Sequence, residues 1–204
     1  MGCCFSSSPD SSVELTSQSD DSAPIKIVES SNAMCMYMED RNCLTAECEG
    51  KLAAASAPVC VEQDRSYWEC QVTHPGEGEF ELIVGVAKKT PLESLAAVLP
   101  SSASDPLPSD LYCVRIPDLK KGDVVGVCFD QSDLPMLTFR LNSEITSHHV
   151  TRVRGAVFPF VAFTGGDPAE GRTTTAVSVV FRRDKFRAEK PDRFDVLMAA
   201  SSLI

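Results

Sequence analysis

The first six residues contain the clearest chemical pattern in the chain. They read MGCCFS, which matches the N-myristoylation pattern M-G-x-x-x-[ST], in which removal of the first methionine exposes a glycine amine for acylation. We therefore predict lipid attachment at Gly2. A single myristoyl chain binds a membrane only weakly and reversibly, so stable anchoring requires a second acyl chain or a basic patch.

The neighbouring cysteines are the predicted second anchoring signal. Residues 1–24 contain four acidic residues and no Lys or Arg, so an anionic membrane surface would repel this segment. Cys3 and Cys4 adjoin the glycine, where the first acyl chain would bring their thiols to the membrane for palmitoylation. The sequence thus predicts a peripheral lipid anchor on the cytoplasmic side of the plasma membrane or an endomembrane. A chance match to the motif is the alternative.

The composition is that of a folded, acidic protein. Of the 204 residues, 43% are hydrophobic and 24% are charged, and the formal net charge is -10, close to the averages of globular chains apart from the acidity. The negative charge argues against nucleic acid as a partner, since the phosphate backbone requires cations. No apolar run is long enough to span a bilayer and no secretory signal is present, so we expect the chain to stay in the compartment where it is made.

The spacing of cysteine and histidine matches no metal site. Apart from Cys3 and Cys4, seven of the nine cysteines remain, an odd number that cannot be fully paired. No CxxC or Cys/His spacing of the zinc type occurs, and no Asp-rich loop has calcium spacing. We expect reduced, mostly buried thiols, no metal and no cofactor.

An enzyme would need a nucleophile and a general base within reach of each other. Cys70 or Cys128 with His148 or His149 are the residues that could form such a pair. Both cysteines lie in apolar runs, where burial raises the pKa of a thiol and makes it inert, and the two histidines are typical of an exposed turn. We therefore predict that the protein is not an enzyme.

From residue 25 onward, short β-type runs alternate with turn signals. One segment interrupts them: residues 90–100 begin with a capping box and predict a short helix. Many short strands separated by turns favour an all-β fold, a two-sheet antiparallel β-sandwich. The predicted strands are 25–28, 34–38, 43–48, 59–61, 67–72, 80–87, 111–116, 124–129, 137–141, 157–163 and 176–181.

The composition and the strand pattern divide the chain into three predicted parts. Residues 1–24 are Ser-rich and acidic without apolar periodicity, and predict a disordered tether. Residues 25–190 form the predicted sandwich domain, and residues 191–204 are the predicted C-terminal tail.

Six stretches of the predicted domain, taken in order, resemble one family. They are YWECQV at 67–72, VGVA at 84–87, GDVVGVCFD at 122–130, LTFRLN at 137–142, VFPFV at 157–161, and VSVVF at 177–181 with Phe186. Their order and spacing resemble the SPRY domain, a β-sandwich of the concanavalin-like type. The chain departs from the pattern in two places, since Ser143 stands at the hairpin glycine and the closing Asn and Gly are absent.

The resemblance implies where a partner would bind. In peptide-binding relatives the contacts come from loops at one end of the sandwich, which correspond here to residues 73–79 and 164–171. The candidate partner-binding residues are Thr73, His74, Thr164 and Asp167. The longest insertion, residues 91–109, is expected to flank the same loops.

Together, the acylation pattern and the resemblance imply a non-catalytic, lipid-anchored module or adaptor that holds a protein partner at a membrane. The alternative is a structural or sorting component of a membrane-associated skeleton that acts through self-association.

Overall fold

The computed structural model of the chain describes the backbone of residues 43–48 and 52–56, and residues 60–75, 80–88, 106–164 and 175–197. Several predictions fall outside the described residues: lipid attachment at Gly2, Cys3 and Cys4, the strands at 25–28 and 34–38, the helix at 90–100, and Asp167.

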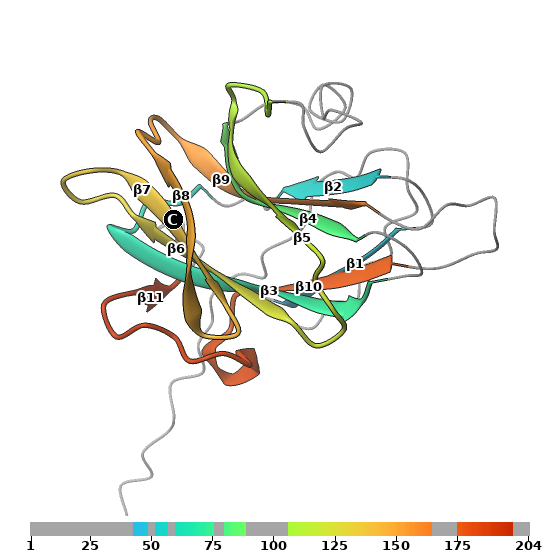
Figure 1. The fold of residues 1–204 in the computed structure, drawn as a ribbon. Coiled ribbons are helices and arrows are strands. Elements are labelled where there is room, and N and C mark those ends of the chain that lie inside the picture. The colour runs from blue at the N-terminus through green and yellow to red at the C-terminus, as the bar shows by residue number, and fades with distance from the viewer. Residues whose placement is uncertain are drawn as a thin grey trace, which may run out of the picture.

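The described chain forms two β-sheets that face each other (Figure 1). Neighbouring strands are antiparallel, except that β11 (Asp195–Val196) pairs parallel with β3. The larger sheet has the order β1 (Cys43–Cys48), β10 (Thr175–Val180), β3 (Arg65–His74), β6 (Val124–Asp130), β7 (Met136–Leu141) and β8 (Glu144–Thr151). The smaller sheet has the order β2 (Leu52–Ser56), β9 (Val157–Thr164), β4 (Glu81–Lys88) and β5 (Leu111–Pro117). The predicted all-β, two-sheet sandwich is confirmed.

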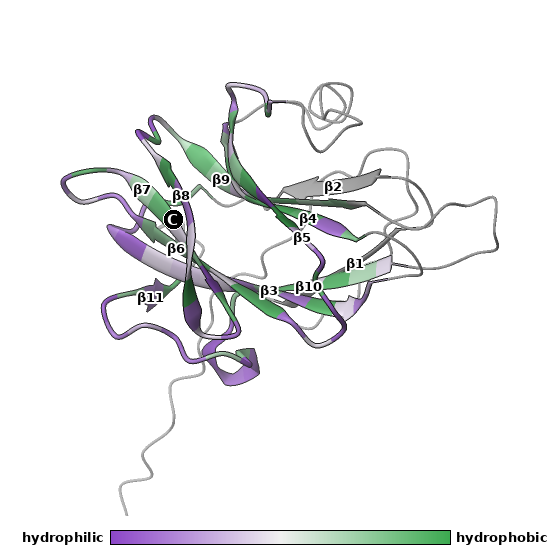
Figure 2. Cartoon of the chain, in the orientation of Figure 1, coloured by the Kyte–Doolittle hydropathy of each residue, from purple (hydrophilic) through white to green (hydrophobic). Residues whose placement is uncertain are grey.

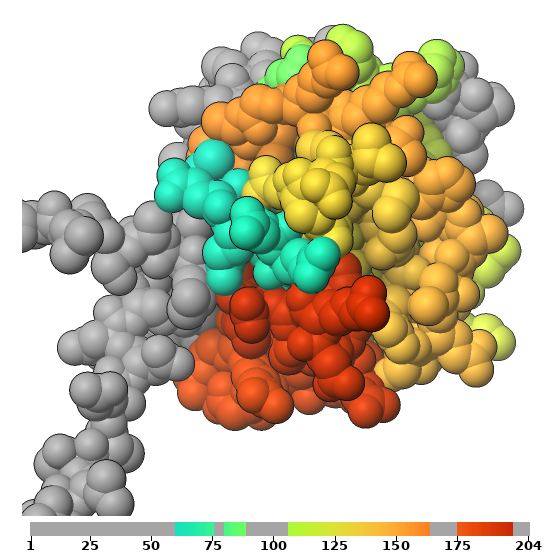
Figure 3. Space-filling model, turned by 90° about the vertical axis from the view of Figure 1, so that its left-hand side faces the viewer, coloured from blue at the N-terminus to red at the C-terminus, as the bar shows by residue number. Residues whose placement is uncertain are grey.

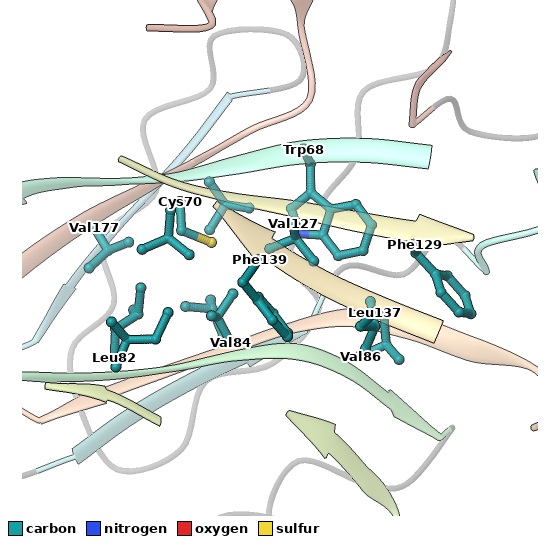
Figure 4. Packing of buried hydrophobic residues seen from close by; sticks show 14 of the residues in the cluster. Trp68, Cys70, Leu82, Val84, Val86, Val127, Phe129, Leu137, Phe139 and Val177 are labelled. Atoms are coloured by element: carbon teal, nitrogen blue, oxygen red, sulfur yellow. The ribbon is translucent and has the colours of Figure 1, made fainter. Parts of the chain in front are cut away.

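The core lies between the two sheets and follows from the two-residue alternation of the strands. Trp68 of β3 and Phe139 of β7 are fully buried and face Val84 and Val86 of β4 (Figure 4). Hydrophobic residues predominate along the paired strands, and hydrophilic ones along the turns and the C-terminal segment (Figure 2). The single tryptophan of the chain therefore lies in the core between the sheets.

Most of the described strands lie where the sequence predicts them. β1 has the predicted bounds, and the bounds of the other predicted strands from β3 onward differ by one or two residues. β2 was missed because its sequence LAAAS has little β propensity. The strand expected at 59–61 is wrong for its two described residues, Cys60 and Val61, which are in no strand, although Val61 donates its backbone N–H to Val157 at 2.9 Å.

β8 was also missed, because both of its faces are exposed or half-exposed and its sequence lacks alternation. His148 and His149 lie within this strand, so the expectation that they form a turn is wrong, although both are exposed.

The C-terminal segment, residues 182–197, crosses the outer face of the larger sheet. It contains one short 3-10 helix (Arg183–Lys185) and ends in β11, followed by the buried Leu197. Figure 3 shows this segment in red against residues of the β3 region and the β7 and β8 hairpin. The packed part of the chain therefore continues past residue 190, where the sequence placed the start of a tail.

Candidate functional site

Several connections between strands meet at one end of the sandwich, which we call the rim. The strand registers place the end of β3, the turn between β5 and β6, the β7–β8 hairpin, the end of β9 and the start of β10 at this end. The described residues of the rim are Thr73–Pro75, residues 118–123, Asn142, Ser143 and the backbone of Thr164. Three of the four predicted partner-binding residues, Thr73, His74 and Thr164, therefore share one end of the fold.

The two predicted residues on β3 have different roles. The Thr73 hydroxyl donates a 2.9 Å hydrogen bond to the backbone oxygen of Ala176, beside a register irregularity in β10. Its side chain is half-buried and holds the two strands together. His74 is exposed and is therefore the residue of the two that can contact a partner.

The β5–β6 turn and the β7–β8 hairpin are fixed to each other by side chains. The Asn142 amide oxygen accepts from the Val124 N–H at 2.9 Å, and its nitrogen donates to Asp123 at 3.0 Å. The second Asp123 oxygen accepts from the Lys120 N–H at 2.7 Å, which closes the turn. These contacts hold the turn and hairpin rigid and leave Lys120 and Lys121 exposed.

The hairpin turn has the backbone expected from its sequence. Asn142 and Ser143 have φ of 50° and 76°, and a two-residue hairpin with positive φ at both central positions matches the twist of the flanking strands. Asn tolerates this conformation, whereas Ser at the second position costs some strain. The family's hairpin glycine is therefore absent, but the turn geometry is retained.

Thr164 and the described residues that flank the long insertion lie at different ends of the sandwich. Thr164 ends β9 and pairs with Leu52 at the rim. Lys88 and Asp110, which flank the insertion in the described part of the chain, are joined by a backbone hydrogen bond of 3.0 Å and an ion pair of 3.1 Å at the opposite end. The insertion is therefore attached to the sandwich at the end opposite the rim, and the expectation that it flanks the rim is wrong for these flanking residues.

The cysteines and histidines considered as a catalytic pair are not brought together. Cys70 faces the core, and burial raises the pKa of its thiol. Cys128 lies on the outer face, where burial raises its pKa to about 11. The registers place Thr138 between Cys128 and His149, which separates the cysteine and histidine by two strand spacings, about 10 Å.

The described cysteines and acidic residues form no metal site. Cys60, Cys70, Cys113 and Cys128 are free thiols, and three of them are buried. Within the described ranges, no three His, Cys, Asp or Glu residues are grouped so that they could hold a metal ion. No helix in this part of the chain is long and apolar enough to cross a membrane.

A buried carboxyl group lies beneath the C-terminal segment, and the sequence analysis did not predict its role. Glu69 is fully buried, and its carboxyl group accepts hydrogen bonds from the Tyr67 hydroxyl at 3.1 Å and the Gln71 amide at 2.8 Å. The backbone N–H groups of Arg187 and Ala188 also donate to it, at 2.9 and 3.0 Å. Four donors satisfy this carboxyl group, so its role is to attach the C-terminal segment to the sheet.

Comparison with known proteins supports the fold. The SPRY domain of human HERC1 superposes with a TM-score of 0.51 at 14% identity, covering 76% of this chain and 96% of that domain. The chain has a SPRY-like fold. A second human SPRY domain gives a TM-score of 0.46 at 16% identity, with coverage of 71% and 94%, and the TRIM65 PSpry domain gives 0.47 at 11%, with coverage of 79% and 90%.

The sequence itself has no such match, since no protein-family model and no curated protein matches it. At 14% identity the likeness to the HERC1 domain supports the fold of the chain alone and leaves its partner open.

Proposed function

We propose that this protein is a non-catalytic interaction module that binds a protein partner through the rim while acyl chains on Gly2, Cys3 and Cys4 hold it at the cytoplasmic face of a membrane. The observation that carries the proposal is the construction of the rim, in which a turn and a hairpin are fixed by the hydrogen bonds of Asp123 and Asn142.

A rigid rim suits recognition for an entropic reason. Loops whose backbone is already ordered lose little backbone conformational freedom when they bind a partner. His74, Lys120 and Lys121 are exposed on such a scaffold, and the SPRY-like fold supports the same reading, because the resemblance implies protein binding at one end of the sandwich.

The charge distribution favours acyl chains over electrostatic attachment. Residues 60–75, 80–88, 106–164 and 175–197 together contain equal numbers of basic and acidic residues, so the net charge of -10 belongs to the rest of the chain. Neither the balanced domain nor the acidic residues 1–24 would attract an anionic leaflet. Membrane binding therefore depends on the predicted acylation sites.

Proximity labelling in cells tests the anchor and the partner together. Wild type and Gly2→Ala are compared, and the proposal expects membrane proteins to be labelled by wild type and lost from the Gly2→Ala set. If wild type and Gly2→Ala label the same set of proteins, the predicted lipid anchor is wrong. Concentration-dependent self-association without any other partner would instead favour the structural or sorting component.

A further inference from the structure

One side of the sandwich is not covered by another described segment, although the C-terminal segment contacts the adjoining hairpin, where the Glu189 N–H donates to the Ser143 hydroxyl. The larger sheet ends there in β8 and the smaller sheet ends in β5, and the two strands contact each other (Figure 1). Every residue of β8 is exposed or half-exposed. An edge strand of this kind directs unpaired backbone N–H and C=O groups outward.

The apolar core is incompletely covered along this side. Four hydrophobic residues pack against the main core but remain only half-buried: Tyr112 and Val114 of β5, Leu141 of β7 and Val150 of β8. Other inward-facing residues of the same sheets, such as Val84 and Val127, are fully buried. We call the strip formed by these four residues and β8 the β5–β8 seam.

The outer face of β8 carries one exposed apolar residue, Ile145. Ile145 is 76% exposed, and the registers place it beside Arg140 on the face turned away from the core. It borders a shallow hollow of about 370 Å³ that is lined by Leu141, Asn142, Glu144, Ile145 and Thr146. A strand added to β8 would therefore have apolar neighbours on both of its faces.

The edge of β8 is only partly protected against pairing. A register irregularity opposite Phe139 interrupts the strand, and there the Thr146 hydroxyl donates to the Phe139 backbone oxygen at 3.0 Å. On either side of the irregularity the pairing is regular, at Glu144 and Ile145 and again from His149 to Thr151. β8 contains no Pro or Lys, the residues that commonly block a sheet edge.

The charges along this edge are unequal. Glu144 stands at the rim end, whereas the exposed Arg152 and Arg154 directly follow the opposite end, after the exposed His148 and His149. Arg152 and Arg154 would attract acidic side chains of a bound segment beyond the far end of β8, whereas Glu144 would oppose them at the rim end.

We propose that the β5–β8 seam binds an extended segment of a protein partner, which adds to β8 as a strand, places apolar side chains along Ile145, Tyr112 and Val114, and ends in acidic residues beside Arg152 and Arg154. Strand addition of this type combines backbone hydrogen bonds with pockets for alternate side chains. The seam adjoins the rim at the β7–β8 hairpin, but Ile145, Arg152 and Arg154 lie outside the rim, so variants at these positions test the seam independently.

Two synthetic peptides test the proposal with the full chain. Each has about ten residues, in which valine alternates with threonine before a run of glutamates placed at one terminus or the other, since β8 accepts a strand in either direction. Fluorescence anisotropy measures binding, and amide NMR shifts locate it. We expect one of the two peptides to bind with shifts centred on β8, and to lose about tenfold or more in affinity when alternate backbone nitrogens are methylated.

Variants of the chain supply matched controls. Ile145→Asp is expected to lower the affinity for the peptide about tenfold. The double variant Arg152→Glu with Arg154→Glu is expected to lower it several-fold. Leu134→Asp changes the other exposed large hydrophobic residue among those described, in the β6–β7 loop, and should leave binding unchanged. Thermal melting of each variant checks that the fold is intact.

Four results would overturn the proposal: no binding of either peptide, equal binding of the methylated form, equal binding to Ile145→Asp, or binding that Leu134→Asp weakens as strongly. The chain could instead dimerise through β8. Dimerisation that is abolished by Ile145→Asp and is not inhibited by either peptide would show that the seam binds a second copy of the chain and not a partner segment.

Discussion

The backbone N–H of Ala188 donates a 3.0 Å hydrogen bond to the carboxyl group of Glu69, which lies 119 residues earlier in the chain and is fully buried in β3. Together with the Arg187 N–H, which donates to the other oxygen at 2.9 Å, this contact attaches the C-terminal segment to the outer face of the larger sheet.

Glu69→Gln should loosen the C-terminal segment. An amide has one acceptor oxygen in place of two, so one of the two backbone N–H groups loses its partner, at a cost of about 1–3 kcal/mol. We expect a lower urea midpoint and faster hydrogen exchange at residues 186–197. Glu189→Gln is the matched control, because Glu189 is exposed. Equal exchange in Glu69→Gln and wild type would show that the attachment does not depend on this carboxyl group.

Gly126→Ala should destabilise the same face through Tyr67. A Cβ at Gly126 would lie 2.6 Å from the Tyr67 hydroxyl and 2.8 Å from its ring. Tyr67 cannot move freely, because its hydroxyl donates to Glu69 and Phe186 packs edge-on against its ring at 5.1 Å. We expect a loss of about 1–3 kcal/mol in the free energy of unfolding. An unchanged denaturation curve would mean that Tyr67 has room to shift.

Trp68→Ala should show how strongly the core depends on its largest side chain. Trp68 is fully buried between the sheets, and truncation of such a residue costs about 3–5 kcal/mol. Urea denaturation measures the loss, with the exposed His149→Ala in the same sheet as control. A loss below about 1 kcal/mol would be incompatible with this packing.

Sequence reasoning reached the parts of the fold that are encoded locally. The strand with Trp68, which is buried along most of its length, was predicted, whereas β8 was missed because each of its residues is at least partly exposed. The role of Glu69 could not be predicted, since two of its four donors are backbone groups that follow it by 118 and 119 residues. The same holds at the rim, where the resemblance indicated Thr73, His74 and Thr164, but the contact between Asp123 and Asn142 depends on tertiary structure.

Gly2→Ala should release the protein from membranes. Without the myristoyl chain the cysteines are not presented for palmitoylation, and no basic patch in residues 1–24 remains to replace it. Fractionation of cell lysates measures the change. Replacement of Cys3 and Cys4 by Ser should give a weakly and reversibly bound form, since one acyl chain provides only marginal affinity. Tight binding of the double Ser variant would exclude palmitate as the second signal.

Capture of the partner should depend directly on His74, whereas Thr73 should affect mainly the stability of the fold. His74→Glu with Lys121→Glu reverses the character of exposed rim residues, and we expect it to lower capture of the partner found by labelling about tenfold or more while the melting curve stays unchanged. Thr73→Val removes the donor to Ala176 and should instead cost about 1 kcal/mol of stability with little direct effect on capture. Arg183→Glu, exposed on the C-terminal segment, is the matched charge control. If Arg183→Glu lowers capture as much as the rim variant does, the partner binds by overall charge and the rim is not the site.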